Sequence, residues 1–308
     1  MKKKNYEVVI IGGGPAGLSA GLYSARARHD TLLLEREIIG GQIINVEKIE
    51  NYPGFADGID GYELSQLMQK QAEKYGLEIV IAEATGLEIN KSGRRVIKTS
   101  EGDVETTAVI FAGAAKRIKL GVPGEEEFTG RGVSVCATCD APLFSDQPVA
   151  VAGGGNAALT EALHLAKFAS GVTVIHRRDQ LRAGALLQER AFAEPKIEFL
   201  WDTTVDAIEG DVFVQKLQLN NVKTGKKSTL EVAGVFVSIG FVPDTAYLKG
   251  VVPLDLTGHI TTNTEMETEV PGVFAAGDIR SKLARQVITA AGDGATAAVS
   301  AGRFITKQ

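Results

Sequence analysis

A glycine-rich motif occurs twice in the chain and constrains its fold more than any other feature. "GGGPAG" begins at Gly12 and "GGGNAA" begins at Gly153, an offset of 141 residues. Each copy follows a β-rich apolar run, "YEVVII" or "PVAVA", and opens a stretch of helical character. Glycines here permit a tight turn and a close backbone approach to a pyrophosphate at a helix N-terminus. One such motif is a weak signal, but two in this context predict two dinucleotide-binding sites.

The order of the other elements predicts the fold class. The run at 6–11 is followed by a helical stretch at 15–28 and a second β-rich run, "TLLLE", so the β-α-β order implies a parallel sheet. Further helices are expected near 61–75, 156–169 and 285–304, and a hairpin should turn at Thr224-Gly225. The sequence therefore predicts an α/β protein with two Rossmann-like dinucleotide-binding domains.

Charge and hydropathy exclude several classes of partner. The net charge is −5, which argues against nucleic acid as a main partner. No apolar run reaches the roughly 18 residues that a membrane span needs. The N-terminal apolar run is only "VVII" and is followed at once by glycines, without a cleavage site after a proper core. We expect a first β-strand rather than a signal peptide, and a cytoplasmic protein without a membrane partner.

The residue at the end of the second strand of each repeat meets the adenosine ribose. In the first repeat it is Glu35, which accepts bonds from ribose hydroxyls and repels a 2′-phosphate, as suits FAD or NAD. In the second it is His176, followed by Arg177 and Arg178, with Arg182 close by. Guanidinium groups pair well with a phosphate dianion, so this site should prefer NADPH. The alternative is a solvated basic loop.

The only two cysteines, Cys136 and Cys139, lie together in "CATCD". A four-cysteine zinc site is impossible, and none of the four histidines lies at a ligand spacing from the cysteines, so we expect no metal. In a reducing cytosol such a pair favours thiol–disulfide chemistry. Asp140 follows directly, either to move a proton to or from a thiolate or as a plain polar residue. Two different dinucleotides and a dithiol suggest electron transfer from NADPH through a flavin to a disulfide.

With these motifs assembled, the chain resembles the low-molecular-weight thioredoxin reductase family from end to end. The most specific motifs are "CATCD", "HRRDQLRA", "VFAAGDI" and "ARQVITAAGDGATAA". The resemblance implies a homodimeric FAD enzyme that takes electrons from NADPH and reduces thioredoxin.

The resemblance also implies a domain arrangement. An NADPH-binding domain at 116–247, which carries the two cysteines, would be inserted into an FAD-binding domain formed by 1–115 and 248–308. Candidate linkers lie near 113–127 and at 240–250. We expect the inserted domain to rotate about them, because one rigid arrangement cannot present both the nicotinamide and the disulfide to the flavin.

Site residues follow from the resemblance position by position. Cys139 would face the flavin, Cys136 would attack the partner, and Asp140 would be the acid or base. FAD contacts would come from the first glycine motif, the "GGQ" segment and the C-terminal motifs: Gly12, Gly14 and Gly17 for the pyrophosphate, Glu35 for the ribose, Gly41, Gln42 and Asn51 along the flavin, Asp278 for the ribityl chain, and Arg285, Gln286 and Val287 at the ring. NADPH contacts would be Gly153, Gly155, Asn156, His176, Arg177, Arg178 and Arg182.

Several alternatives stay open. Without the resemblance, Asp278 is equally a helix cap, and "AAGDGATAA" a tightly packed helix. Many family members have a glycine where this chain has Ala141, and Ala157 and Thr160 depart from the family pattern after the second glycine motif, which leaves the strictness for NADPH over NADH open. Rival functions are a relative with another electron donor such as ferredoxin, a dithiol oxidase of the same fold, and a non-enzymatic redox-sensing or scaffold protein.

Overall fold

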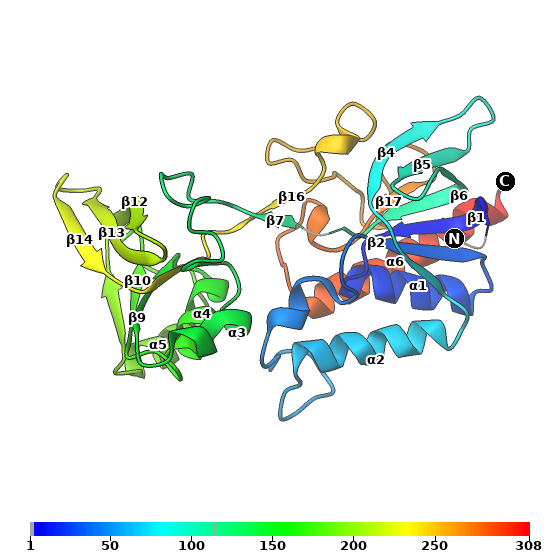
Figure 1. Cartoon of the computed structure of the whole chain (residues 1–308). Helices are drawn as coiled ribbons and strands as arrows, with labels where there is room; N and C mark the ends of the chain where they lie inside the picture. The colour runs from blue at the N-terminus through cyan, green and yellow to red at the C-terminus, as the bar shows by residue number, and fades with distance from the viewer. Residues whose placement is uncertain (1–2, 114) are drawn as a thin grey trace. The chain divides into compact units, whose positions relative to one another are not determined.

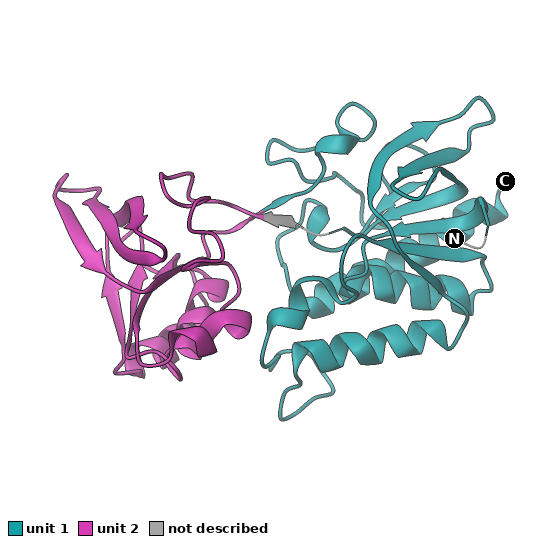
Figure 2. Cartoon of the chain, in the orientation of Figure 1, with its two compact units in different colours: residues 1–116, 242–308 teal, residues 117–241 magenta. Residues whose placement is uncertain are grey.

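The computed structural model describes residues 3–113 and 115–308, which form two compact units (Figure 2). Unit 1 consists of residues 1–116 and 242–308, and unit 2 of residues 117–241. The chain crosses between the units in two short strands, β7 (Ala115–Arg117) and β16 (Phe241–Pro243), which pair with each other. The return crossing thus falls at this strand pair, before the predicted boundary at residue 248.

Unit 1 is built on a seven-stranded sheet with β1 (Asn5–Ile11) at its centre. Strands β3, β2, β1 and β6 follow one another in parallel register, and the far edge of β6 is shared by parallel β17 and by the antiparallel pair β5 and β4 (Figure 1). The bounds are β2 Thr31–Glu35, β3 Glu78–Ile81, β4 Ala84–Ile89, β5 Arg95–Thr99, β6 Val104–Phe111 and β17 Val273–Ala275. The N-terminal apolar run is therefore a β-strand, as predicted, and it lies at the centre of the sheet.

Three helices cover one face of this sheet: α1 (Pro15–Arg26), α2 (Gly61–Glu73) and α6 (Val287–Thr306) (Figure 1). Alternate residues of β1 point to opposite faces, so Val8 and Ile10 pack under the helices while Val9 and Ile11 join a second core layer. Helices α1 and α6 approach closely, because a Cβ at Gly294 would lie 2.0 Å from the carbonyl oxygen of Ala16. The "AAGDGATAA" helix is thus tightly packed.

Unit 2 contains a five-stranded parallel sheet in the order β11-β10-β9-β15-β8. Its strands are β8 Val133–Ser134, β9 Pro148–Ala152, β10 Gly171–Ile175, β11 Ile197–Leu200 and β15 Gly234–Val237. One face carries α3 (Ala137–Asp140), α4 (Asn156–Leu165) and α5 (Ala185–Ala193). The other packs against an antiparallel sheet of β12 (Thr203–Gly210), β13 (Val214–Asn221) and β14 (Lys227–Glu231).

The structure confirms the predicted α/β class and the β-α-β start of each unit. The predicted hairpin turn is also present, since Gly225 adopts a φ of 68° between β13 and β14. Strands β4, β5, β11 and β12 and helix α5 were not predicted from the sequence. Within the described part of the chain, no helix combines the length and hydropathy that spanning a membrane demands.

Candidate active site

The first glycine motif forms the turn between β1 and α1 in unit 1. Gly12 has a φ of 111°, and a Cβ there would lie 2.5 Å from the carbonyl oxygen of Ala112. A Cβ at Gly17 would lie 1.8 Å from the oxygen of Gly12. Gly14, the N-cap of α1, has no side-chain cap, and a Cβ there would only reach van der Waals distance from Gly40 and Gly41. The N-terminus of this 12-residue helix therefore carries no side-chain group that would compete with a phosphate for its backbone N–H groups.

Glu35 lies where the sequence analysis expected it, at the carboxyl end of β2 beside the glycine turn. Its Oε2 accepts a hydrogen bond from the backbone N–H of Gly13 at 2.7 Å, and its Oε1 accepts one from Glu37 at 3.1 Å. A cavity of about 330 Å³ is lined by Gly12, Glu35, Arg36 and other residues of unit 1. The carboxylate is thus fixed on the wall of a cavity that adjoins the first glycine turn.

The "GGQ" segment packs onto the same turn. Gly40 and Gly41 have φ values of 116° and 60°, and a Cβ at Gly41 would lie 3.1 Å from the Cα of Gly14. Gln42 follows in a 3₁₀ turn, Gly41–Asn45. The two glycines therefore let this segment cross close to the glycine turn.

Asn51 and Gln286 meet although they are far apart in the sequence. Asn51 Nδ2 donates a hydrogen bond to Gln286 Oε1 at 2.8 Å. Gln286 is also the N-cap of α6 and forms a capping box with Thr289, so Val287 begins the helix. The start of the longest helix is therefore held against the segment after "GGQ", and its N-terminus favours nearby negative charge.

Asp278 carries an orphaned polar atom. Its Oδ1 is buried and has no hydrogen-bond partner among the described residues. Burial raises the pKa of this carboxyl group, and the charges of Lys282 and Arg285 oppose the rise. A buried oxygen without a donor is costly, so a ligand hydroxyl at this place would satisfy it. The orphaned oxygen, the glycine turn and the cavity together fit a flavin dinucleotide.

Arg285 is held by His259, which the sequence did not mark as a site residue. Arg285 Nη2 donates to His259 Nε2 at 3.0 Å, so the imidazole is the Nδ1–H tautomer and donates to Thr257 Oγ1 at 2.7 Å. Thr257 in turn donates to Asp255 Oδ1 at 2.7 Å. Burial and the Arg285 charge lower the pKa of His259. The imidazole is therefore neutral near pH 7 and fixes the guanidinium.

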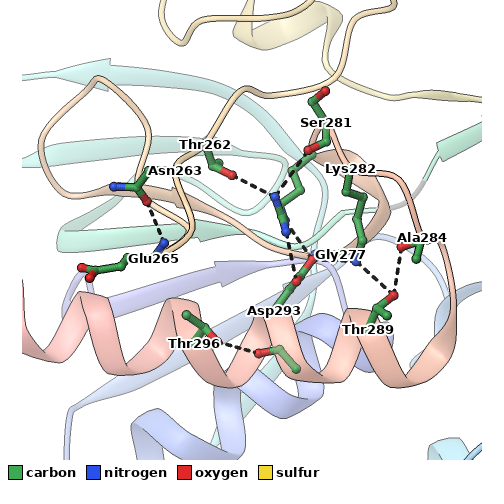
Figure 3. Close-up of polar contacts among 12 residues, drawn as sticks. Thr262, Asn263, Glu265, Gly277, Ser281, Lys282, Ala284, Thr289, Asp293 and Thr296 are labelled. Atoms are coloured by element: carbon green, nitrogen blue, oxygen red, sulfur yellow. Dashed lines mark hydrogen bonds and ion pairs between the residues drawn. The ribbon is translucent and has the colours of Figure 1, made fainter.

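A buried ion cluster joins α6 to residues 277–282 (Figure 3). Asp293, on α6, accepts from Arg280 Nε at 2.9 Å, from Lys282 Nζ at 2.7 Å and from the backbone N–H of Gly277 at 3.1 Å. Its carboxylate anchors the chain on both sides of Asp278. Sequence spacing gave no sign of this cluster, because its members come from a loop and a helix.

In unit 2, Cys136 and Cys139 form a disulfide bond across α3. Cys136 is half-buried and Cys139 is exposed. Asp140 Oδ2 accepts a hydrogen bond from Ser134 Oγ at 2.6 Å, and the same hydroxyl accepts the backbone N–H of Cys136 at 3.1 Å. Ser134 is buried and was not predicted as a site residue. It links the carboxylate to the backbone of the first cysteine.

The second glycine motif repeats the first turn between β9 and α4. Gly153 has a φ of 151°, and a Cβ there would lie 2.2 Å from the carbonyl oxygen of Ser238. Gly155 is the N-cap of α4 and has open space around it. Asn156 Oδ1 accepts the backbone N–H of Gly184 at 2.7 Å. Asn156 therefore braces the turn against the loop that precedes α5.

His176 occupies the position equivalent to Glu35 but plays a different local part. Its ring is buried against the backbone, since a Cβ at Gly154 would lie 2.4 Å from Nδ1. Its Nε2–H donates to the carbonyl oxygen of Gln180 at 3.1 Å. Burial lowers the pKa of the imidazole, and the neighbouring arginines lower it further. His176 is thus neutral and supports the loop that carries the arginines, and it does not add a positive charge to that loop.

Arg177, Arg178 and Arg182 are exposed and lie together on a cavity of about 390 Å³. Arg182 is positioned by its backbone N–H, which donates to the carbonyl oxygen of Gly154 at 2.8 Å. The arginines that the sequence singled out therefore converge beside the second glycine turn, as an anionic ligand would require.

A buried carboxylate, Glu161, lies on α4 behind the second glycine turn. Its Oε1 pairs with Arg117 Nη1 at 2.9 Å. Burial raises the pKa of Glu161, and the charge of Arg117 and a side-chain hydrogen bond with Ser238 oppose the rise. The carbonyl oxygen of Ser238 lies against Gly153, so Ser238 contacts both the carboxylate and the turn.

Residues 6–294 match the pyridine nucleotide-disulphide oxidoreductase family. The curated thioredoxin reductase of Peptoclostridium acidaminophilum is 44% identical over 308 residues, with 97% of each chain covered. That of Bacillus subtilis is 44% identical and covers 99% of this chain and 96% of its own.

Solved structures agree with these matches. Lactococcus lactis thioredoxin reductase in its FR conformation gives a TM-score of 0.96 at 44% identity, covering 98% of this chain and 100% of that one. The enzyme from T. acidophilum gives 0.93 at 32% identity, with 99% of both chains covered. The chain therefore belongs to the pyridine nucleotide-disulphide oxidoreductase family and, within it, to the low-molecular-weight thioredoxin reductases.

Proposed function

We propose that the chain is a thioredoxin-disulfide reductase that passes electrons from NADPH, through FAD and the Cys136–Cys139 disulfide, to thioredoxin. The observation that carries this proposal is a disulfide bond in a chain with two glycine turns of the dinucleotide-binding kind. Its matches to thioredoxin reductases over nearly the whole length support the same reaction.

In this proposal unit 1 holds FAD. The turn of Gly12, Gly14 and Gly17 would hold the pyrophosphate, Glu35 would bind the ribose hydroxyls, and the orphaned Oδ1 of Asp278 would accept a hydrogen bond from a ribityl hydroxyl. The remaining contacts are expected from Gly41, Gln42, Asn51, Arg285, Gln286 and Val287. Bound flavin would supply a two-electron carrier between nicotinamide and disulfide.

Unit 2 would hold NADPH at its own glycine turn, with Gly153 and Gly155 at the pyrophosphate and Asn156 bracing the turn. The 2′-phosphate would lie among Arg177, Arg178 and Arg182, while His176 supports their loop. The converging arginines favour NADPH over the rival electron donors that the sequence left open.

The dithiol step needs only residues of this chain and the partner. After two-electron reduction, the Cys136 thiolate attacks the thioredoxin disulfide and forms a mixed disulfide, which releases one thioredoxin thiol. The Cys139 thiolate then attacks Cys136 Sγ, re-forms the internal disulfide and releases the second thiol. Asp140, whose carboxylate accepts a hydrogen bond from Ser134, would exchange the proton that accompanies thiolate formation.

Two properties of the assembly belong to the same proposal. We infer a cytoplasmic homodimer, in which a second copy covers exposed apolar side chains of unit 1 such as Ile38, Tyr62 and Leu283. We also infer that unit 2 turns about β7 and β16 during the cycle, since nicotinamide and disulfide must each reach the flavin. Sedimentation of the holoenzyme tests the first inference, and a cross-link between the units that stops multiple turnovers tests the second.

The test of the reaction is anaerobic NADPH oxidation by the purified flavin-loaded protein with oxidised thioredoxin. We expect oxidation that depends on thioredoxin and is lost in Cys136→Ser. Oxidation that needs oxygen instead of thioredoxin would identify a dithiol oxidase, and activity only with reduced ferredoxin would identify a relative with another donor.

A further inference from the structure

The arginine cavity of unit 2 is lined by residues from three separate segments. The loop after β10 supplies the arginines, the turn between β11 and β12 supplies Asp202, and the β13–β14 hairpin supplies Val222 and Lys223. The hairpin lies about forty residues beyond the arginines in the sequence. Its lysine was not marked by any motif.

Backbone hydrogen bonds tie the hairpin to the arginine loop. The N–H of Asp202 donates to the carbonyl oxygen of Arg178 at 3.3 Å, and the N–H of Val222 donates to the carbonyl oxygen of Asp202 at 2.6 Å. Asp202 has a φ of 51°, a left-handed conformation that Asp tolerates better than most residues. These backbone hydrogen bonds therefore fix the position of Lys223 at the cavity wall, whichever rotamer its side chain adopts.

The charges of the cavity match a phosphate monoester only when Lys223 is counted. The lining holds four cations and two carboxylates, a formal charge of +2, namely Arg177, Arg178, Arg182 and Lys223 with Asp179 and Asp202. A phosphate monoester carries about −1.5 to −2 at pH 7. Without the lysine the formal charge is +1, which leaves a dianion incompletely neutralised.

Lys223 differs from the arginines in having partners. Its Nζ lies 2.8 Å from Asp179 Oδ2 and 3.0 Å from Asp202 Oδ2, whereas no ion pair joins the three arginines to a carboxylate among the described residues. The lysine and Asp179 side chains are 57% and 63% exposed, so water weakens their pairing. Two carboxylates thus hold the ammonium at the cavity, where it can exchange to phosphate oxygens.

We propose that Lys223 is a specificity-determining residue that binds the 2′-phosphate of NADPH from the hairpin, opposite the arginine loop. This inference rests on the proposed use of NADPH. The arginine loop and the β13–β14 hairpin together bind the 2′-phosphate. The hairpin supplies the positive charge that favours a phosphate monoester over an unphosphorylated ribose.

The test compares Lys223→Ala with Lys226→Ala in the flavin-loaded protein. Lys226 lies on the same turn, is exposed and does not line the cavity, so it controls for loss of one positive charge. Isothermal titration with 2′-phospho-ADP-ribose and with ADP-ribose measures the 2′-phosphate directly, without turnover. We expect Lys223→Ala to raise the Kd of the phosphorylated ligand about five- to twentyfold and to change that of ADP-ribose less than about twofold. Lys226→Ala should match the wild type.

A conservative variant separates charge from packing. Lys223→Arg keeps a cation that can bind phosphate, so it should retain most of the affinity and most of the salt dependence that Lys223→Ala loses. Equal Kd values for wild type and Lys223→Ala, or equal losses for both ligands, would overturn the inference. If Arg177→Ala removes the preference for 2′-phospho-ADP-ribose over ADP-ribose but Lys223→Ala does not, the use of NADPH stands and only the proposed role of Lys223 is wrong. A wild type that binds both ligands equally would contradict NADPH use itself.

Discussion

Replacing Asp293 by asparagine should destabilise unit 1, because among the described residues its carboxylate is the only one that forms an ion pair with the buried cations Arg280 and Lys282 (Figure 3). The side chains of Asp293, Arg280 and Lys282 are only 11%, 16% and 6% exposed, so solvent screens the cluster little. Removing one partner of a buried ion pair costs about 3–5 kcal/mol, since it leaves the other charge uncompensated. The amide oxygen of asparagine still accepts one hydrogen bond, which favours the lower end, about 3 kcal/mol.

This loss should be visible as a lower melting temperature. For a domain of 150–250 residues, about 1 kcal/mol corresponds to about 2–4 °C, so the midpoint should fall by about 6–12 °C. The assay is a thermal scan of flavin release, which reports on unit 1, together with fluorescence of Trp201, the single tryptophan, which lies in unit 2. Asp103→Asn, which removes an exposed partner of Lys98 in unit 1, is the matched control and should change the midpoint little.

The same cluster predicts a pH dependence. Burial raises the pKa of Asp293, but hydrogen bonds from Arg280 and Lys282 outweigh it, so the pKa in the folded protein is lowered. The stabilisation is therefore present above the ordinary Asp pKa of about 3.9 and is lost as the pH falls through the lower folded value. The difference between wild type and Asp293→Asn should shrink in acid. If the midpoint of flavin release from Asp293→Asn lay within about 2 °C of the wild-type midpoint at pH 7, the reasoning would be refuted.

The remaining predictions concern cofactor choice, the cysteines and the glycine turn. Arg177→Ala or Arg178→Ala should raise the KM for NADPH about ten- to a hundredfold with a much smaller effect for NADH; equal losses would show that they do not read the 2′-phosphate. Cys136→Ser should leave a Cys139 thiolate that gives a long-wavelength charge-transfer absorbance, which Cys139→Ser lacks, and the reverse pattern would exchange their roles. Gly17→Ala places a Cβ 1.8 Å from a backbone oxygen, so the protein should purify without flavin absorbance.

The repeated strand, glycine turn and helix were predictable because they depend on short-range patterns. Glycines, apolar runs and helix starts lie within one segment of about 25 residues in each unit. The predicted equivalence of Glu35 and His176 is confirmed by their contacts. Glu35 contacts Gly13 and His176 contacts Gly154, and both pairs are related by the same offset of 141 residues. The offset could not reveal that the histidine is buried beneath its loop, because burial depends on the fold around it.

The ion cluster around Asp293 and the hairpin lysine were not predictable for a different reason. Asp293 meets Arg280 and Lys282 only because an irregular loop returns to α6. Lys223 lines the same cavity as the arginines only because the connections that follow β10, β11 and β13 lie together in unit 2. Long-range contacts of this kind leave no periodic trace in the sequence, and a charged residue on a hairpin is ordinarily solvent-exposed.

The most direct test of the proposed electron path is a spectral titration of the flavin-loaded protein with NADPH under anaerobic conditions. The account predicts that full reduction takes about two equivalents of NADPH per chain, since the flavin and the disulfide are each two-electron couples, but about one in the Cys136→Ser, Cys139→Ser double variant. Oxidised thioredoxin should then restore the oxidised flavin spectrum in the wild type only. Reoxidation of the double variant by thioredoxin, or a wild type that is reduced by NADPH but not reoxidised by thioredoxin, would contradict the account.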